Sequence, residues 1–275
     1  MLIFHIGLPK TATTFLQYKL FARSLQENFF HWKSEPHVKE VMRFAQGRFS
    51  RADNRALAIT AWLRHLRVDR TSLVSSENIS LLPSFWSGRG ASPREVAERL
   101  LFLTEAAGVG SHRMKIIMGV RRQDQMLASR YSQLASARPE CTQEGFEKSI
   151  AFILDKAAET AAFRWLYFDI CKREIEEVVG AENLCIYPAE RLASDPESVV
   201  SKLGDFCETD FLPSLKEAIA EGKLRKVNRK SVAPDQWKLG QSKERLSLGP
   251  ELKAAILDHF HESNVRFRSL TGLSF

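Results

Sequence analysis

The first 21 residues constrain the fold of this chain more than any other stretch, because three local patterns follow one another there without a gap. An apolar run over residues 2–6 predicts a buried strand. The Gly-Leu-Pro that follows it predicts a sharp turn. From Phe15 onward, apolar residues recur at helical spacing and predict an amphipathic helix. These residues therefore predict a strand, a loop and a helix in succession.

The loop places Lys10 among three threonines, Thr11, Thr13 and Thr14. A cation, several hydroxyl groups and the free N–H groups of a helix N-terminus together favour the binding of an anion. A nucleotide-binding P-loop has this order of elements, but it needs a glycine-rich run that ends in Gly-Lys-Ser/Thr. Here the lysine comes three residues after Gly7. The alternative without a ligand is a capped helix with a lysine on its surface.

Residues 7–17, Gly-Leu-Pro-Lys-Thr-Ala-Thr-Thr-Phe-Leu-Gln, closely resemble the 5′-phosphosulfate-binding loop of sulfotransferases, which use 3′-phosphoadenosine-5′-phosphosulfate (PAPS). The resemblance implies a catalytic role for Lys10, which would neutralise charge on the bridging oxygen and the transferring group. It also implies six cofactor-binding residues: Lys10, Thr11, Ala12, Thr13, Thr14 and Phe15. The family usually has glycine where this chain has Ala12. A methyl group there crowds a backbone that must approach a phosphate closely.

A second segment resembles the part of the same family that binds the 3′-phosphate of PAPS. A predicted strand over residues 114–120 leads into Arg121, with Ser129 eight residues later and Tyr131 two residues beyond it. The family has an arginine, a serine and an aromatic residue at this spacing. A guanidinium gives paired donors to phosphate, and the serine adds a hydroxyl donor. The Asn-Pro or Asp-Pro that often follows the arginine is absent, which leaves open whether Arg121 or Arg122 faces the phosphate.

Two later segments extend the resemblance. Arg229 and Lys230 lie in a stretch similar to the family's C-terminal cofactor loop and would add a second cationic clamp on the 3′-phosphate. A solvated basic loop is an equal alternative for these two residues. Asp195 precedes Pro196 and is interpreted as the cap of a helix, which supports the fold and carries little chemistry.

Glu77 is the candidate catalytic base. It directly follows a predicted strand over residues 72–76. By resemblance, this position carries the base, a histidine in many cytosolic members and a glutamate in many carbohydrate-modifying ones. The alternatives are that Glu77 caps the next turn or orients Arg121. His5 lies inside the first predicted strand and is expected in the core.

The whole chain of 275 residues predicts one α/β domain. Predicted strands at about 2–6, 72–76, 114–120 and 183–187 alternate with helical stretches. This alternation favours a central parallel sheet with helices on both faces and a P-loop-like phosphosulfate-binding loop. Ligands bind at the carboxyl ends of such strands, so the helical and loop insertions at about 26–70 and 80–112 are expected to shape the acceptor pocket.

In the second insertion, Phe85, Trp86 and Arg89 are interpreted as lid residues or, preferably, as residues that pack under a loop.

The formal net charge of +7 and the pI near 9.3 suit a protein that handles anions. Nucleic acid is disfavoured as a partner because Lys and Arg are scattered and no RNA-binding or zinc-finger motif is present. No segment is long and apolar enough to span a membrane, and the first predicted strand leaves no room for a signal peptide, so we expect a cytoplasmic protein. The four cysteines show no Cys-x-x-Cys spacing, and no metal is expected.

The residues and the resemblance together predict a PAPS-dependent sulfotransferase. It would transfer a sulfuryl group to a hydroxyl or amine of a small-molecule or glycan acceptor and release adenosine 3′,5′-bisphosphate. Two alternatives stay open. One is a nucleotide-dependent, kinase-like P-loop enzyme, and the other is a catalytically silent protein that binds PAPS or a nucleotide.

Overall fold

A five-stranded parallel sheet forms the centre of the molecule, with the strand order β2-β3-β1-β4-β5. The computed structural model describes residues 1–8, 10–31, 33–66, 71–80, 83–135, 141–222, 231–233, 235–239 and 244–273. The strands of the sheet are β1 (Leu2–His5), β2 (Phe29–His31), β3 (Ser72–Ser75), β4 (Met114–Val120) and β5 (Leu184–Pro188). A separate antiparallel sheet contains β6 (Ser231–Ala233), β7 (Gln236–Lys238) and β8 (Arg245–Ser247).

Helices connect the strands. The α-helices are α1 (Thr13–Phe15), α2 (Ala22–Leu25), α3 (Pro36–Ala45), α4 (Asn54–His65), α5 (Pro93–Ala106), α6 (Gln123–Leu134), α7 (Gln143–Lys156), α8 (Phe168–Val179), α9 (Ala189–Ser194), α10 (Pro196–Cys207), α11 (Leu212–Ala220), α12 (Pro250–His259) and α13 (His261–Thr271). The π-helical segment η1 (Leu16–Phe21) continues α1, and 3₁₀ turns form η2 (Gln26–Asn28), η3 (Glu77–Ile79), η4 (Pro83–Ser87), η5 (Ser111–Arg113), η6 (Ala161–Leu166) and η7 (Ala181–Asn183).

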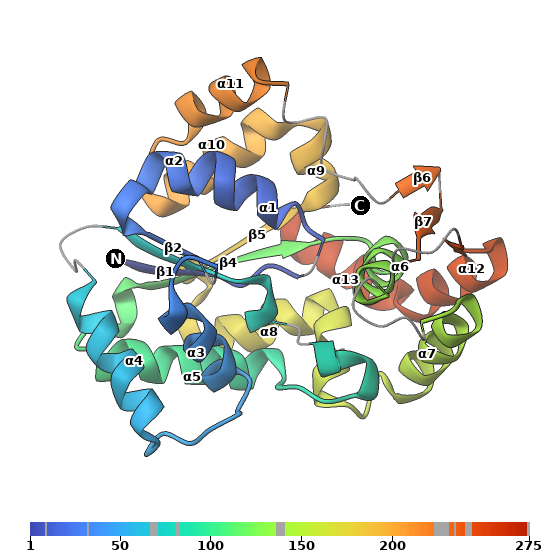
Figure 1. The fold of residues 1–275 in the computed structure, drawn as a ribbon, viewed down its shortest axis with the longest axis horizontal. Coiled ribbons are helices and arrows are strands. Elements are labelled where there is room, and N and C mark those ends of the chain that lie inside the picture. The colour runs from blue at the N-terminus through green and yellow to red at the C-terminus, as the bar shows by residue number, and fades with distance from the viewer. Residues whose placement is uncertain are drawn as a thin grey trace.

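Two hydrophobic cores cover the two faces of the parallel sheet. Successive strand residues point to opposite faces, so Phe4 packs in one core and Ile3 in the other. Figure 1 shows α3, α4, α5 and α8 on one side of the sheet and α1, α2, α10 and α11 on the other. Because both faces are buried, the strands read in the sequence as continuous apolar runs. The prediction of a parallel sheet with helices on both faces is confirmed.

The predicted strands agree closely with the observed ones. The strand predicted at 114–120 is β4. The strands predicted at 2–6 and 72–76 end one residue beyond β1 and β3, and the strand predicted at 183–187 is displaced by one residue from β5 at both ends. The sequence did not predict the small antiparallel sheet or β2, which lies within the segment predicted as a helical and loop insertion. These missed strands have three residues each, too few for hydrophobic periodicity to identify them.

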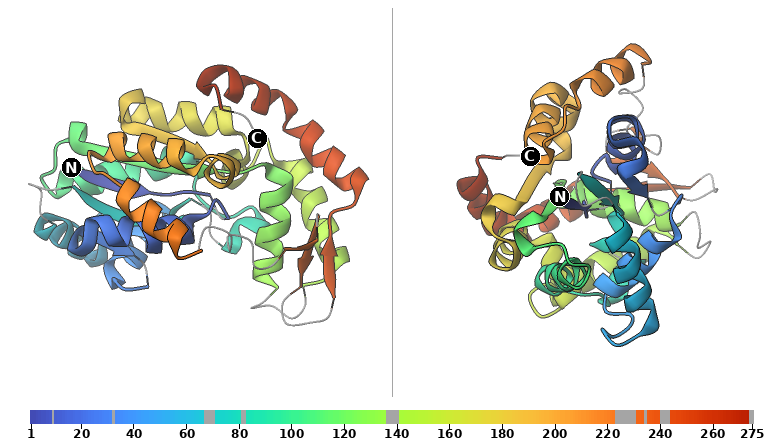
Figure 2. Two further views of the ribbon diagram at one scale, coloured as in Figure 1. Left: turned by 90° about the horizontal axis from the view of Figure 1, so that it is seen from above. Right: turned by 90° about the vertical axis from the view of Figure 1, so that its left-hand side faces the viewer.

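The order of the strands places the loop after β1 at a preferred ligand site. The chain first fills one side of β1 with β2 and β3, and then the other side with β4 and β5. In open α/β sheets, ligands bind at the carboxyl ends of the strands where the order reverses in this way. The two views in Figure 2 show the same sheet from above and from its end.

Side chains cap the starts of α5 and α10, and the cap predicted at Asp195 is present. Ser92 and Glu95 form a reciprocal capping box at α5, and the Asp195 carboxylate accepts a hydrogen bond from the Ser198 N–H at the start of α10.

Phe85 is buried, which confirms packing for this residue over a lid role. In the described part of the chain, no helix has the length and apolar character needed to cross a membrane.

Candidate active site

The loop after β1 leaves the sheet in a strained conformation. The N–H groups of Ile6 and Leu8 each donate to a carbonyl of β4 at 2.9 Å, which extends the pairing beyond β1. Lys10 and Ala12 then adopt left-handed backbone conformations, with φ of 70° and 59°. For residues with a Cβ, this region costs about 1–2 kcal/mol each. Strain of this kind concentrates at ligand sites.

Ala12 departs from the family pattern at the position where its backbone is strained. Its φ of 59° and ψ of 21° lie in the left-handed region that glycine adopts without a steric cost. From the sequence, its methyl group is expected to crowd a backbone that must approach a phosphate closely. The structure adds a reason within the chain itself, because the methyl group also disfavours the observed backbone.

The three threonines of the loop have different surroundings. The Thr11 hydroxyl donates to the Leu8 carbonyl at 2.7 Å and closes the loop internally. The buried Thr13 hydroxyl donates to Oε2 of Glu77 at 2.8 Å, whereas Thr14 is exposed. Glu77 begins η3, with Ser76 between it and the end of β3. The structure therefore brings the candidate base Glu77 into contact with the loop.

Arg121 and Arg122, which the sequence did not distinguish, differ in their partners. Arg121 donates to the Lys10 carbonyl at 3.3 Å, so it reaches the loop. Arg122 makes a two-point pair with the buried Asp124 at 2.7 and 2.8 Å. Burial lowers the pKa of Arg121, and the charge of Glu190 opposes that shift. An arginine remains a cation despite such a shift.

The other predicted 3′-phosphate contacts are placed in part. Ser129 is buried on α6, eight residues after Arg121. Tyr131 packs edge-on against Trp86 with ring centroids 5.3 Å apart, beside the buried Phe85. Arg229 and Lys230 lie outside the described residues, and their roles stay predictions.

Arg130 is a residue of the site that the sequence analysis missed. Its guanidinium donates to the Asn78 side chain at 3.3 Å and to the Gln133 side chain at 3.0 Å. Burial lowers the pKa of Arg130, while the negative charge of Glu77 acts in the opposite direction. Arg130 stands four residues after Met126, on the buried side of α6. Residues four apart lie on the same face of a helix, so the spacing from Met126 could have placed Arg130 on this face of α6.

A chain of buried polar side chains lies beneath the loop, and this was also missed. His5 contacts Ser75 on β3 and Tyr187 on β5, and Gln17 on η1 contacts Ser75. The prediction that His5 belongs to the core is confirmed, since its side chain is fully buried. Burial, with a smaller effect of His31, lowers the pKa of His5 to about 3. His5 is therefore neutral at physiological pH.

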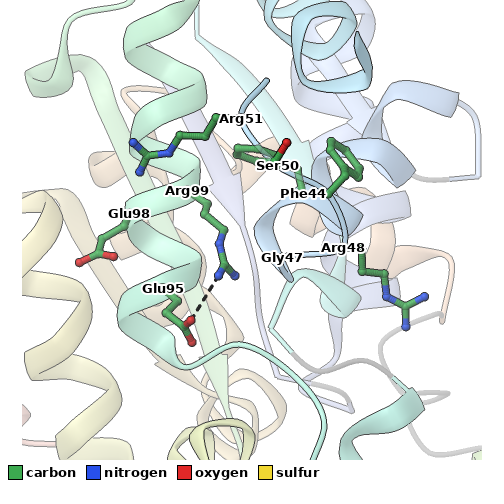
Figure 3. Close-up of a pocket in the computed structure, with 9 residues that line it drawn as sticks. Phe44, Gly47, Arg48, Ser50, Arg51, Glu95, Glu98 and Arg99 are labelled. Atoms are coloured by element: carbon green, nitrogen blue, oxygen red, sulfur yellow. Dashed lines mark hydrogen bonds and ion pairs between the residues drawn. The ribbon is translucent and has the colours of Figure 1, made fainter. Parts of the chain in front are cut away.

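A hollow of about 570 Å³ separates the end of α3 from α5. We call it the α3–α5 hollow, and its lining residues are Phe44, Gly47, Arg48, Phe49, Ser50, Arg51, Glu95, Glu98 and Arg99. They come from both segments predicted to shape an acceptor pocket, which itself stays a prediction. In Figure 3, Arg99 turns toward Glu95, and the other two arginines point in different directions.

Among the described residues, no cluster of three or more His, Cys, Asp or Glu side chains is suited to hold a metal ion.

Comparison with known proteins gives a structural relative. No protein-family model matches the sequence, and no curated protein matches it either. Among solved structures, the fold is similar to that of a sulfotransferase from Alicyclobacillus acidocaldarius, with a TM-score of 0.54 and 15% sequence identity. The similarity covers 99% of this chain and 96% of that one. The chain therefore has the fold of a solved bacterial sulfotransferase over nearly its full length.

Proposed function

We propose that this protein is a PAPS-dependent sulfotransferase that sulfates a hydroxyl or amine of an acceptor. One observation gives the main support for the proposal. A strained loop with a lysine, at the carboxyl end of the central strand, contacts both an arginine and a carboxylate, Arg121 and Glu77. The similarity to a solved sulfotransferase supports the same interpretation.

The donor set of the loop suits a phosphosulfate group. The first N–H groups of a helix have no partner within the helix, and left-handed residues in a loop turn neighbouring N–H groups toward one concave side. Lys10 adds a cation to these donors, and Arg121 and Ser129 would hold the distant 3′-phosphate. When bound, PAPS supplies the sulfuryl group and a good leaving group.

The remaining residues act on charge and on the acceptor proton. Lys10 stabilises the negative charge that develops between the transferring group and the phosphate. Glu77 receives the proton of the acceptor hydroxyl as that oxygen attacks. Thr13 orients the Glu77 carboxylate through their 2.8 Å hydrogen bond, and the charges of Glu77 and Arg130 attract each other. The acceptor is a small molecule or a glycan, and a glutamate base favours the glycan by resemblance only.

Thermal unfolding with three ligands tests this proposal against its alternatives. Adenosine 3′,5′-bisphosphate at 100 times its Kd should stabilise the protein by about 2.7 kcal/mol, and ATP with magnesium should not. Stabilisation by ATP with magnesium alone would favour the kinase-like alternative and reject a sulfotransferase. An acceptor screen with labelled PAPS then tests turnover. Binding without turnover, followed by turnover in Ala12→Gly, would identify a catalytically silent binder.

A further inference from the structure

The buried polar side chains beneath the loop form one continuous chain of hydrogen bonds. Gln17 contacts Ser75 at 2.8 Å, Ser75 contacts Nδ1 of His5 at 2.8 Å, and Nε2 of His5 contacts the Tyr187 hydroxyl at 3.2 Å. The Tyr187 hydroxyl then donates to the Thr11 carbonyl at 3.1 Å. The hydrogen-bond chain therefore starts on η1, passes through residues of β3, β1 and β5, and ends on the backbone of the loop.

The donor and acceptor capacity of each group determines the position of every proton in this hydrogen-bond chain. A carbonyl only accepts, so the single proton of Tyr187 goes to Thr11, and the tyrosine oxygen accepts from Nε2–H of His5. In a neutral imidazole the other nitrogen accepts, so Nδ1 receives the Ser75 proton. The Ser75 oxygen in turn accepts from the Gln17 amide. All donations therefore run in one direction, toward the loop.

The last bond sets the orientation of one peptide group. In a trans peptide the C=O and the following N–H point in opposite directions. Tyr187 holds the Thr11 carbonyl toward itself, so the Ala12 N–H points away from Tyr187. Rotation of this peptide by half a turn would bring the φ of Ala12 from 59° to a negative value and relieve its strain. The Tyr187 bond opposes that rotation.

The surroundings leave little room for another arrangement. A Cβ built on Gly119, the β4 neighbour of Tyr187, would lie 2.4 Å from the tyrosine oxygen and 2.5 Å from the Thr11 hydroxyl oxygen. Both distances are far below van der Waals contact. Glycine at this position of β4 therefore leaves the space that the Tyr187 and Thr11 side chains occupy. His5, Gln17 and Ser75 are buried as well, which makes an unpaired group in the chain costly.

We infer that Tyr187 and His5 are positioning residues that keep the Thr11–Ala12 peptide turned with its N–H toward the bound anion. The inference rests on the proposed function for the identity of that anion. The residues themselves do not touch the ligand. They act through the backbone of the loop, and Ala12 makes them necessary, because a glycine would hold the same conformation without strain.

Tyr187→Phe tests the inference, since it removes one hydroxyl and keeps the ring in the core. Loss of a single neutral hydrogen bond to a buried group should raise the Kd for adenosine 3′,5′-bisphosphate about tenfold. Tyr167→Phe is a matched control, because the Tyr167 hydroxyl also contacts a histidine, His259, at 2.9 Å, but between α8 and α12. This control should leave the Kd unchanged.

Two further measurements separate positioning from stability alone. In an Ala12→Gly background, Tyr187→Phe should raise the Kd only about twofold, because no strain then drives the peptide rotation. Amide hydrogen exchange of the peptide that spans residues 8–16, measured without ligand, should be faster in Tyr187→Phe and unchanged in Tyr167→Phe.

The outcomes are distinct for the inference and for the proposed function. A Tyr187→Phe variant with a lower Tm, a Kd within twofold of the wild type and unchanged exchange in the loop would reduce Tyr187 to a core residue and overturn the inference. A wild-type protein that binds no bisphosphate would reject the proposed function. The exchange comparison would still decide whether the hydrogen-bond chain holds the loop.

Discussion

The loop after β1 and the α3–α5 hollow both carry cations, but the two regions surround their charges differently. In the hollow, Arg99 pairs with Glu95 at 3.2 Å, one helical turn away on α5. Near the loop, Arg121 donates to a carbonyl, and Arg130 donates to two neutral side-chain amides. Carboxylates still act on both loop arginines, Glu190 on Arg121 and Glu77 on Arg130, but neither carboxylate accepts a hydrogen bond from them. Their positive charge is therefore less closely paired than that of Arg99 and more available to attract an anion.

Backbone strain also differs between the loop after β1 and the α3–α5 hollow. The loop holds two non-glycine residues in left-handed conformations, and buried hydrogen bonds beneath it fix one of its peptides. In the hollow, the positive φ of 71° belongs to Gly47, where it costs little. A pair such as Arg99 and Glu95 contributes about 0.3–0.5 kcal/mol. We therefore expect substitutions at the loop to affect function and matched substitutions at the hollow to have little effect.

The largest effect is expected for Lys10→Ala. Loss of the cation that stabilises the developing charge should lower kcat/KM about 10³-fold, equivalent to about 4 kcal/mol, and leave the Tm close to that of the wild type. Steady-state kinetics with PAPS measure this. Arg48→Ala, which removes a cation from the hollow, is the matched control and should retain activity. Retained turnover in Lys10→Ala would remove the lysine from the mechanism.

Glu77→Gln should lower kcat about 10²-fold, since the amide keeps the shape but accepts no proton. Its Kd for the bisphosphate should stay near the wild-type value, because the substitution leaves the phosphate-binding donors in place. Glu98→Gln in the hollow is the control for loss of one carboxylate. Nearly normal turnover in Glu77→Gln would assign the base to another residue.

The sequence predicted the parts of this arrangement that are local. The strand, the turn and the helix of residues 2–21 follow from hydrophobic spacing and from Gly7, and β4 follows from one long apolar run. The resemblance to a sulfotransferase loop identified Lys10 and Glu77 as candidates, and the structure brings Glu77 to the loop through Thr13. Their catalytic roles stay predictions.

The missed features depend on contacts between distant segments. Tyr187 and His5 are 182 positions apart, and no local pattern marks a tyrosine in an apolar strand as the partner of a loop carbonyl. Arg121 and Arg122 are distinguished by the hydrogen bond from Arg121 to the Lys10 carbonyl, 111 positions away, whereas Arg122 pairs with Asp124 nearby in the sequence. Strain at Ala12 also needed coordinates, because the sequence gives the residue type and the fold determines its φ.

Acid should destabilise the network beneath the loop. Burial lowers the pKa of His5 to about 3, so as pH falls below about 6.5 the unfolded chain binds a proton that the folded protein does not. Stability is therefore lost as pH falls, by about 2 kcal/mol between pH 7 and pH 5 from His5 alone. His31, whose pKa burial lowers to about 4, should add to this loss.

Urea unfolding at pH 7 and at pH 5 measures this acid effect. His5→Gln should show a smaller difference in the free energy of unfolding between the two pH values than the wild type. His37→Gln, which replaces a partly exposed histidine at the start of α3, is the control for loss of an imidazole outside the buried hydrogen-bond chain. An unchanged difference in His5→Gln would mean that His5 is not held neutral in the folded protein.

The smallest effect is expected for Ala12→Gly, and it tests the strain directly. Glycine adopts the observed φ of 59° freely, so the free energy of unfolding should rise by about 1 kcal/mol. Removal of the methyl group should also improve affinity for the bisphosphate. Glu208→Gly is the matched control, since Glu208 has a φ of 54° at the end of α10, away from the loop. It should gain stability without a change in affinity. If both variants gain stability and neither gains affinity, the Ala12 methyl group strains the chain but does not crowd the anion.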